Sequence, residues 1–427
     1  MTEPSASRSL EDWLAWQATA HPRGIDMGLE RIRKVWQRLG SPLPAPMVIS
    51  VGGTNGKGST VAFLEAMLRA GGLRVGTFTS PHLLRYNERV RIDGLDADDA
   101  SLVQAFERIE EARGDISLTY FEFGALAAIL LFARREVDVA VLEVGLGGRL
   151  DAVNLIDADV AIVTTVDLDH QDWLGNDRES IAREKAGIFR PRRPAIIGDN
   201  DPPPTLLDVA KELGSLVQRA GRDFSAETTS TGWRWSSGSE TLELPLPAME
   251  APCQIRNAAT AISALHALRD RIAWQPSAIA AGIVNARVGG RLQRLADAPM
   301  LVVDVAHNPQ AARELAAWIE ANPIPGRNIA VFGALDDKDV AGMLEPLLRH
   351  VHEWHLCALC GASPRGLSLD ELEKRLHGRT QFTVGGRHED VESALGAASQ
   401  AARREDRVLA FGSFFVVAGV LAKQTAA

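Results

Sequence analysis

The sequence predicts an α/β protein built around mostly parallel sheets. Short runs rich in β-branched residues alternate with longer stretches of helical period, and this alternation is typical of strand–helix–strand units. The chain has 427 residues, which is too many for one ordinary core and favours two or three domains. The stretch ARVGGRLQRLADAP separates two series of such units, and we place a boundary near residues 288–298. We therefore expect a larger N-terminal domain, residues 1–290, and a smaller Rossmann-like C-terminal domain, residues 291–427.

The predicted strands fall into two series with amphipathic stretches between them. The first series consists of PMVISV, RVGTF, DVAVLEV, DVAIVTT and PAIIG. The second consists of MLVVDVA, NIAVFG, EWHLCAL and RVLAFG. Residues 220–245 differ, because they are short, polar and contain Gly and Trp, and they predict a small antiparallel excursion.

Composition and charge exclude several classes of protein. A net charge of −9 argues against a general nucleic-acid surface, so an anionic substrate must meet local cations or metal ions. The N-terminal stretch MTEPSASRSLEDW has no apolar core and does not resemble a secretory signal. We find no run of about eighteen apolar residues and predict no membrane span. Three cysteines indicate a reducing, cytoplasmic location.

The stretch GGTNGKGST, residues 52–60, joins a predicted buried strand to a predicted amphipathic helix. Glycines allow backbone N–H groups to approach phosphate oxygens, and the helix N-terminus adds a favourable dipole. Lys57 would then reach the outer phosphates of a nucleotide, while the hydroxyl of Ser59 or Thr60 could approach a metal ion. The spacing departs from G-x-x-x-x-G-K-[ST], because Gly58 separates Lys57 from Ser59. A glycine turn that merely starts a helix is the simpler alternative.

Three further strands of the first series end in side chains that can bind a metal. These are Ser80 after RVGTF, Glu143 in DVAVLEV and His170 after DVAIVTT. Ligands in doubly wound sheets bind beyond the carboxyl ends of strands, so the three groups could form a Mg²⁺ set around ATP. The alternatives are a turn serine, a structurally paired buried carboxylate and a surface histidine.

The stretch NDRESIAREKAGIFRP predicts a helix with a lysine on its apolar face. Asn176 and Glu179 have the spacing of a capping box. Ile181, Lys185 and Ile188 share one face at spacings of four and three. A snorkelling lysine or an ion pair would explain this position. Burial also favours a neutral amine, which can add CO₂ to give an anionic carbamate that could help hold magnesium.

The second series repeats the strand–loop–helix theme in MLVVDVAHNPQAARELAAW. Asn308 predicts an N-cap and Pro309 the first helical residue, so both have structural roles. Asp304 and His307 have no such role and are candidates for ligand contact. HEWHLCALC gathers two histidines and two cysteines, but a strand points the members of each pair to opposite faces, and we expect no zinc site there.

These motifs resemble those of the folylpolyglutamate and dihydrofolate synthases, within the Mur ligase superfamily. GTNGKGS resembles their ATP loop, and TSPHLLRYNERV, EVGLGGRLDAVN, VTTVDLDHQDWLG and EKAGI resemble further motifs in the same order. The resemblance implies an N-terminal P-loop ATPase domain, a C-terminal ligase domain and an active site in the cleft between them. It implies an ATP-dependent ligase that adds L-glutamate to dihydropteroate and to folylpolyglutamates through an acyl phosphate, with two Mg²⁺ sites.

The resemblance also assigns roles to single residues. It makes Ser80, Glu143 and His170 the metal ligands and Lys185 a carboxylated lysine, with Lys57, His170 and Lys185 as the catalytic set. The positions implied to bind ATP are Gly56, Lys57, Gly58, Ser59, Asn257, Arg291, Asp304 and His307. An Arg291 near a hinge could clamp phosphates, although it could equally be a linker surface charge.

IDMGLERIRKVW and LTYFEFGALAA resemble segments that line the pterin side of the family's site. The positions implied to bind pteroate are Asp26, Met27, Gly28, Leu29, Thr119, Tyr120, Phe121, Glu122, Leu150, Asp151 and Ala152. Phe121 and Phe123 could stack on a flat heteroaromatic ring, or they could belong to the core.

The sequence differs from the family motifs at two places, and two alternative functions remain open. Phe415 stands where the family usually has histidine, and GGRLQ replaces the more usual PGRFQ. A Mur ligase acting on UDP-muramoyl peptides would share the chemistry, but about fifty residues precede the glycine loop and such enzymes need an extra N-terminal domain. A non-catalytic nucleotide-binding regulatory protein would not need Glu143, His170 and Lys185. We expect a monomer whose partners are small molecules, not nucleic acid or a membrane.

Overall fold

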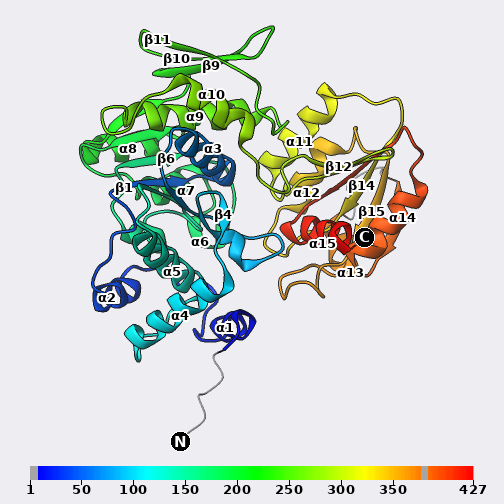
Figure 1. Cartoon of the computed structure of the whole chain (residues 1–427). Helices are drawn as coiled ribbons and strands as arrows, with labels where there is room; N and C mark the ends of the chain where they lie inside the picture. The colour runs from blue at the N-terminus through cyan, green and yellow to red at the C-terminus, as the bar shows by residue number, and fades with distance from the viewer. Residues whose placement is uncertain (1–7, 377–382, 427) are drawn as a thin grey trace, which may run out of the picture. The chain divides into compact units, whose positions relative to one another are not determined.

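The computed structural model describes residues 8–376 and 383–426, and the chain forms two compact units (Figure 1). By their contacts, the first unit comprises the residues up to Val166, Trp173–Pro247 and Ile255–Ala286. The second comprises Asp167–Asp172, Ala248–Gln254 and the chain from Arg287 onward. The prediction of an α/β fold with mostly parallel sheets is confirmed.

The first unit contains an eight-stranded sheet in the order β4-β3-β2-β5-β1-β6-β7-β8. Its strands are β1 (Met47–Gly52), β2 (Val75–Phe78), β3 (Val90–Ile92), β4 (Leu95–Asp96), β5 (Val139–Glu143), β6 (Val160–Val163), β7 (Pro194–Ile197) and β8 (Leu216–Arg219). The neighbours from β2 to β8 are parallel, whereas β3 and β4 pair antiparallel at one edge. β1 lies between β5 and β6, and its residues are buried throughout, as expected of a central parallel strand.

Helices surround this sheet, and α3 packs on β1, β2 and β5 while α10 packs on α3 (Figure 1). The helices of the unit are α1 (Leu10–Gln17), α2 (Glu30–Arg38), α3 (Lys57–Ala70), α4 (Asp99–Arg113), α5 (Tyr120–Arg135), α7 (Arg178–Ala186), α8 (Pro204–Leu213), α9 (Cys253–Ala267), which begins in the second unit, and α10 (Pro276–Asn285). The shorter turns are η1 (Tyr86–Arg89), η2 (Ala152–Leu155) and α6 (Gln171–Leu174), which starts at the end of the 167–172 segment. A separate antiparallel sheet, in the order β11-β10-β9, confirms the excursion predicted for residues 220–245. Its strands are β9 (Phe224–Thr228), β10 (Trp233–Ser237) and β11 (Glu240–Leu244).

The second unit contains a six-stranded sheet in the order β12-β13-β17-β14-β15-β16. Its strands are β12 (Gln293–Asp297), β13 (Met300–Val303), β14 (Asn328–Phe332), β15 (Glu353–Cys357), β16 (Val384–His388) and β17 (Arg407–Phe411). Only the pairing of β12 with β13 is antiparallel among these strands. Its helical elements are α11 (Pro309–Ala321), α12 (Val340–Leu344), η3 (Glu345–Leu347), α13 (Leu369–Leu376), α14 (Val391–Ala401) and α15 (Phe414–Ala426).

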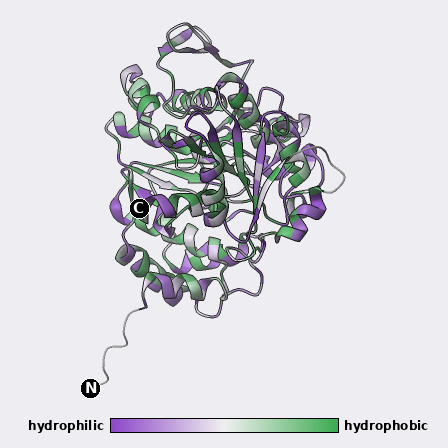
Figure 2. Ribbon diagram, turned by 90° about the vertical axis from the view of Figure 1, so that its right-hand side faces the viewer, coloured by the Kyte–Doolittle hydropathy of each residue, from purple (hydrophilic) through white to green (hydrophobic). Residues whose placement is uncertain are grey.

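Each sheet carries its own apolar core, and the helices present mixed surfaces to it. The helical ribbons in Figure 2 carry both hydrophobic and hydrophilic residues, which is the pattern of amphipathic helices on a sheet. Fully buried aromatic side chains anchor both cores, among them Phe78 and Phe132 in the first and Phe332 and Trp354 in the second. Among the described residues, no helix is both long and apolar enough to cross a bilayer.

Candidate active site

The glycine loop follows β1 and leads directly into α3. Gly53 and Gly56 have φ values of 143° and 86°, a region that L-residues rarely adopt. Gly56 is the N-cap of α3, and no side-chain cap bond accompanies it. The two residues after β6 hold the loop: the Thr54 amide donates to the Thr165 carbonyl at 2.8 Å, and the Thr164 hydroxyl donates to the Asn55 carbonyl at 2.6 Å.

The lysine of this loop lies over the loop itself. Lys57 Nζ donates to the carbonyls of Gly53 and Thr54 at 3.0 and 3.1 Å. The Thr60 hydroxyl donates to the Gly56 carbonyl at 2.9 Å, whereas Ser59 is buried at the start of the helix. An ammonium, a glycine-rich turn and a helix N-terminus therefore coincide, and this combination suits a phosphate group.

Glu143 and Ser80 lie beside the start of α3. Glu143 ends β5, pairs in register with Val51 of β1 and is 4% exposed. Its Oε2 accepts a hydrogen bond from the Ser80 amide at 3.3 Å. A Cβ built on Gly58 would lie 3.7 Å from the same oxygen. Two of the three predicted metal ligands thus converge on the glycine loop.

Asn257 reaches the glycine loop from α9. A Cβ built on Gly56 would lie 2.6 Å from Asn257 Oδ1, so the two residues are in close contact. Asn257 is itself buried. The structure therefore brings this predicted ATP contact to the loop, although about two hundred residues separate them in the chain.

Lys185 lies on α7 with its side chain buried. Lys185 is 4% exposed, and Ile181 on the same helix is also buried, as predicted. Ile188 is buried too, but it lies after the end of α7 and therefore not on the helical face. α7 packs against the loop after β5: the Arg149 amide donates to the Glu184 carbonyl at 2.8 Å. The predicted cap at Asn176 is wrong, because Asp177 is the N-cap and accepts from the Ser180 amide at 2.7 Å. The Asp177 carboxylate, one residue later, reaches the free Ser180 amide of the first helical turn, whereas Asn176 lies before the N-cap position.

The three segments predicted to bind pteroate meet around the loop after β5. A Cβ on Gly145 would contact the Phe121 ring at 2.6 Å, and one on Gly147 would lie 3.4 Å from Met27 Cε. Arg31 ties two of the segments together, because it donates to Asp26 Oδ2 at 2.7 Å and to Glu122 Oε1 at 3.2 Å.

Thr119 and Glu122, both predicted pteroate contacts, form a capping box at the start of α5. Phe123 is fully buried and belongs to the core, whereas Phe121 is half-buried. Of the two aromatic rings, only Phe121 keeps a surface that a ligand could contact.

Asp151, also predicted on the pteroate side, is the N-cap of η2. Its carboxylate accepts from the amides of Leu146 and Val153 at 2.8 and 3.1 Å. Burial raises the pKa of Asp151 to about 6, and these amides and nearby Lys57 partly oppose that rise. The carboxylate therefore organises the loop between Glu143 and the pteroate segments; Leu150 and Ala152 are its neighbours in the chain.

The structure contains a histidine–arginine–tyrosine cluster made of His82, Tyr86, Arg89 and Tyr120, of which only Tyr120 was given a role from the sequence. Arg89 Nε donates to His82 Nδ1 at 2.8 Å, and its guanidinium lies 5.4 and 5.3 Å from the centres of the Tyr86 and Tyr120 rings. Burial and the neighbouring charge of Arg89 together lower the pKa of His82 to about 4, and Glu88 opposes part of this shift. The signal that could have found the cluster was the stretch PHLLRYNERV directly after Ser80.

In the second unit, the predicted ligand residues gather at the end of β13. Asp304 accepts from the amides of Leu292 and Ala306, both at 2.8 Å. Burial raises the pKa of Asp304, and the neighbouring Arg291 opposes the rise. The His307 ring lies 5.7 Å from the ring of Phe414, and the Arg291 guanidinium lies at the same distance from that ring. Asn308 caps α11 and Pro309 begins it, as predicted.

His170 lies in the short segment Asp167–Asp172, which belongs by its contacts to the second unit. Its φ is 51°, a strained value for a residue with a Cβ. Beside it, the Asp169 carboxylate forms an ion pair with Lys338 at 2.7 Å and lies 3.6 Å from His307 Nε2. Burial raises the pKa of Asp169, but His307, His170 and Lys338 together outweigh burial, and the net pKa falls well below its usual range. Asp169 and Lys338 were not singled out from the sequence.

No group of three or more His, Cys, Asp or Glu side chains in the described residues forms a metal site. In the stretch HEWHLCALC, His355 stacks on His388, and His352 accepts a hydrogen bond from the Asn328 amide. Mg²⁺ prefers oxygen ligands and retains water and phosphate oxygens, so Glu143 and Ser80 are donors of the appropriate kind.

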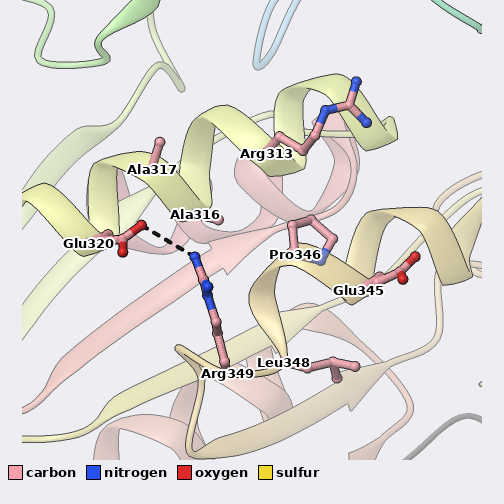
Figure 3. Close-up of a pocket in the computed structure, with 8 residues that line it drawn as sticks. All are labelled: Arg313, Ala316, Ala317, Glu320, Glu345, Pro346, Leu348 and Arg349. Atoms are coloured by element: carbon pink, nitrogen blue, oxygen red, sulfur yellow. Dashed lines mark hydrogen bonds and ion pairs between the residues drawn. The ribbon is translucent and has the colours of Figure 1, made fainter.

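A hollow of about 410 Å³ lies on the second unit between α11 and η3 (Figure 3). Arg349 and Glu320 form an ion pair across it at 3.3 Å. None of the eight residues that line it is a predicted site residue. The hollow therefore does not define the functional site.

Comparison with known proteins identifies the family. A model of the Mur ligase middle domain matches residues 51–264, and one of the Mur ligase, glutamate ligase domain matches residues 290–414. The dihydrofolate synthase/folylpolyglutamate synthase of Escherichia coli is 47% identical over 419 residues, covering 98% of this chain and 96% of the relative. The Haemophilus influenzae protein of the same name is 42% identical over 431 residues, covering 97% of each chain.

Solved structures agree with the sequence relatives. E. coli FolC in complex with DHPP and ADP superposes with a TM-score of 0.92 at 47% identity, covering 99% of each chain. A bifunctional folylpolyglutamate synthase/dihydrofolate synthase with Mn, AMPPNP and L-glutamate bound superposes with a TM-score of 0.89 at 46% identity, also covering 99% of each chain. The chain thus belongs to the dihydrofolate synthase/folylpolyglutamate synthase family of ATP-dependent Mur-type ligases.

Proposed function

We propose that this enzyme joins L-glutamate to dihydropteroate, and also to folylpolyglutamates, in two steps. A carboxylate oxygen of the folate substrate attacks the γ-phosphorus of ATP, ADP leaves, and an acyl phosphate forms. The glutamate amine then attacks the acyl carbon, phosphate leaves, and the amine loses a proton as the amide forms. The observation that carries this proposal is the convergence of the glycine loop, Ser80 and Glu143 at the ends of three adjacent parallel strands.

The glycine loop binds the phosphates of ATP in this proposal. Backbone amides at Gly56, Gly58 and Ser59 face the phosphate oxygens, and Asn257 borders the loop. Lys57 leaves the carbonyls of Gly53 and Thr54 and stabilises the negative charge that develops on the transferred phosphoryl group.

Ser80, Glu143 and His170 are proposed as the protein ligands of Mg²⁺. The Glu143 carboxylate fits this role because it is buried at the edge of the glycine loop. When bound, the metal would neutralise phosphate charge. We propose two such sites, with Lys185 carboxylated to supply an anionic oxygen; the buried position of Lys185 supports this. Intact-mass measurement at bicarbonate saturation should show the added CO₂, and finding only free amine would contradict the modification.

In this proposal the C-terminal unit contributes Arg291, Asp304 and His307 to the nucleotide. The clustering of these three residues at the end of β13 supports the assignment. Asp26–Leu29, Thr119–Glu122 and Leu150–Ala152 bind pteroate, supported by their meeting around Gly145 and Gly147. A monomeric state, partners limited to small molecules and a cytoplasmic location remain predictions.

An assay with purified protein, ATP, L-glutamate and dihydropteroate tests the proposal. We expect phosphate release that requires all three substrates, with dihydrofolate as product. A matched Glu143→Gln variant should lose this activity but fold normally, because the amide keeps the shape of the side chain. Turnover with a UDP-muramoyl peptide instead would identify the Mur ligase alternative, and nucleotide binding without turnover would identify a regulatory protein.

A further inference from the structure

The segment Asp167–Asp172 is held by the second unit through one buried ion pair and several weaker contacts. Lys338 Nζ lies 2.7 Å from Asp169 Oδ1, and the two side chains are only 6% and 8% exposed. Asn308 Nδ2 donates to Asp169 Oδ2 at 3.2 Å. By contrast, the Arg313–Asp167 pair on the same segment has the same 2.7 Å length, but its arginine is 57% exposed.

The Asp169 carboxylate also determines the backbone of the next residue. Its Oδ1, the oxygen that meets Lys338, accepts a hydrogen bond from the His170 amide at 2.9 Å. His170 has φ 51°, which an L-residue keeps only when its surroundings impose it. That backbone conformation fixes the direction in which the Cα–Cβ bond of His170 leaves the chain.

Lys338 itself is occupied by acidic partners. Besides Asp169, its Nζ lies 3.4 Å from Asp337 Oδ2, and Asp337 also lies 3.5 Å from Arg365 and 3.9 Å from His170 Nδ1. An ammonium enclosed by two carboxylates has its charge compensated within the protein. This arrangement suits a structural cation better than one kept for a substrate phosphate.

We propose that Lys338, acting through Asp169, is a positioning residue that fixes the left-handed backbone at His170 and hence the direction of its Cα–Cβ bond. The consequence for metal binding rests on the proposed function, in which His170 is a Mg²⁺ ligand. The positioning itself does not depend on it. Partners that orient a metal ligand typically change metal affinity by about 10- to 100-fold when they are removed.

Hydrogen exchange of the ligand-free protein tests the positioning directly. Lys338→Met should accelerate exchange of the peptide that covers residues 167–172 by about tenfold or more, because the carboxylate that accepts the His170 amide loses its anchor. Lys338→Arg should restore part of the protection. Arg313→Met is the matched control and should leave the exchange near the wild-type rate. Wild-type exchange in Lys338→Met would overturn the proposal.

Activity measurements then test the consequence for the metal. We expect Lys338→Met to raise the Mg²⁺ concentration needed for half-maximal turnover by about tenfold or more, with the KM for dihydropteroate unchanged. A lower kcat with wild-type exchange and wild-type Mg²⁺ dependence would show direct substrate contact and overturn positioning. If the wild-type protein shows no ligase turnover, the proposed function is wrong. The exchange data would still test whether Lys338 holds the backbone at His170. If Lys338→Met does not fold, Asp169→Asn replaces it, because this variant carries no carboxylate charge at position 169. It should show the same acceleration of exchange in residues 167–172. Wild-type exchange in Asp169→Asn would overturn the proposal.

Discussion

Two turns of this molecule lead from a parallel strand into a helix, yet they end differently. After β13, the Asn308 side chain accepts from the Ala311 amide at 3.0 Å, and Pro309 begins α11. After β1, Gly56 begins α3 in a left-handed conformation with no side-chain cap bond. The first arrangement stabilises a helix with its own side chain, whereas the second gives up that stabilisation.

The difference shows which helix start is suited to an anion. A capping oxygen satisfies an amide donor and also places partial negative charge where a phosphate would bind. The glycine turn places the Lys57 ammonium at the start of α3 and supplies no side-chain capping oxygen. Each turn also has a buried aspartate, Asp151 near the glycine loop and Asp304 after β13, and burial raises the pKa of both.

Removing the cation of the glycine turn should have the largest effect. We expect Lys57→Met to lower kcat/KM for ATP by about 10²- to 10³-fold, because the charge of the transferred phosphoryl group loses its ammonium partner. Steady-state kinetics measure this, and the melting temperature checks folding. The exposed Lys211→Met is the control. A loss of less than about threefold would remove Lys57 from the proposed chemistry.

Adding a side chain to the glycine turn should have the next largest effect. In Gly56→Ala, the new Cβ would lie 2.6 Å from Asn257 Oδ1 at φ 86°. We expect nucleotide affinity to fall by about tenfold or more, measured by calorimetry. Gly72→Ala is a matched control, since Gly72 has φ 83° and no atom within 4 Å of the new Cβ. Equal effects of the two variants on ATP binding would mean that the contact with Asn257 is unimportant.

The buried carboxyl near the glycine turn should make stability depend on pH. The Asp151 pKa is raised from 3.8 to about 6, so its stabilising contribution is complete below about pH 4 and is lost as pH rises through 6. Asp151→Asn should therefore gain about 1–3 kcal/mol of unfolding free energy relative to wild type between pH 4 and pH 7. Urea titrations at several pH values measure this. A difference independent of pH would contradict the raised pKa.

Removing the side-chain cap of the other turn should have the smallest effect. We expect Asn308→Ala to cost about 1 kcal/mol of unfolding free energy, because one amide of the first turn of α11 loses its partner. Asp390, which caps α14 through the Ser393 amide at 2.7 Å, is the control, and Asp390→Ala should cost a similar amount. If Asn308→Ala costs much more, its bond to Asp169 has a larger role than the cap.

Local patterns in the sequence predicted most of the elements and the candidate functional side chains. The alternation of strands and helices, the glycine loop, and the cap at Asn308 depend on neighbours within a few residues, so periodicity and turn chemistry predicted them. The cap at Asp177 shows the limit of this reasoning: Asn176 and Asp177 are adjacent, and only the path of the chain selects one. The same local patterns, through their resemblance to known motifs, indicated the family.

Contacts between distant segments were decided only by the tertiary structure. Asn257 meets Gly56, Arg31 bonds to Glu122, and Lys338 pairs with Asp169, each across a long stretch of chain. No local pattern specifies which buried charge meets which, because that choice depends on strand order and on how helices pack against the sheets. The sequence by itself therefore determined which groups this protein has for chemistry, and the fold decided which residues hold those groups in place.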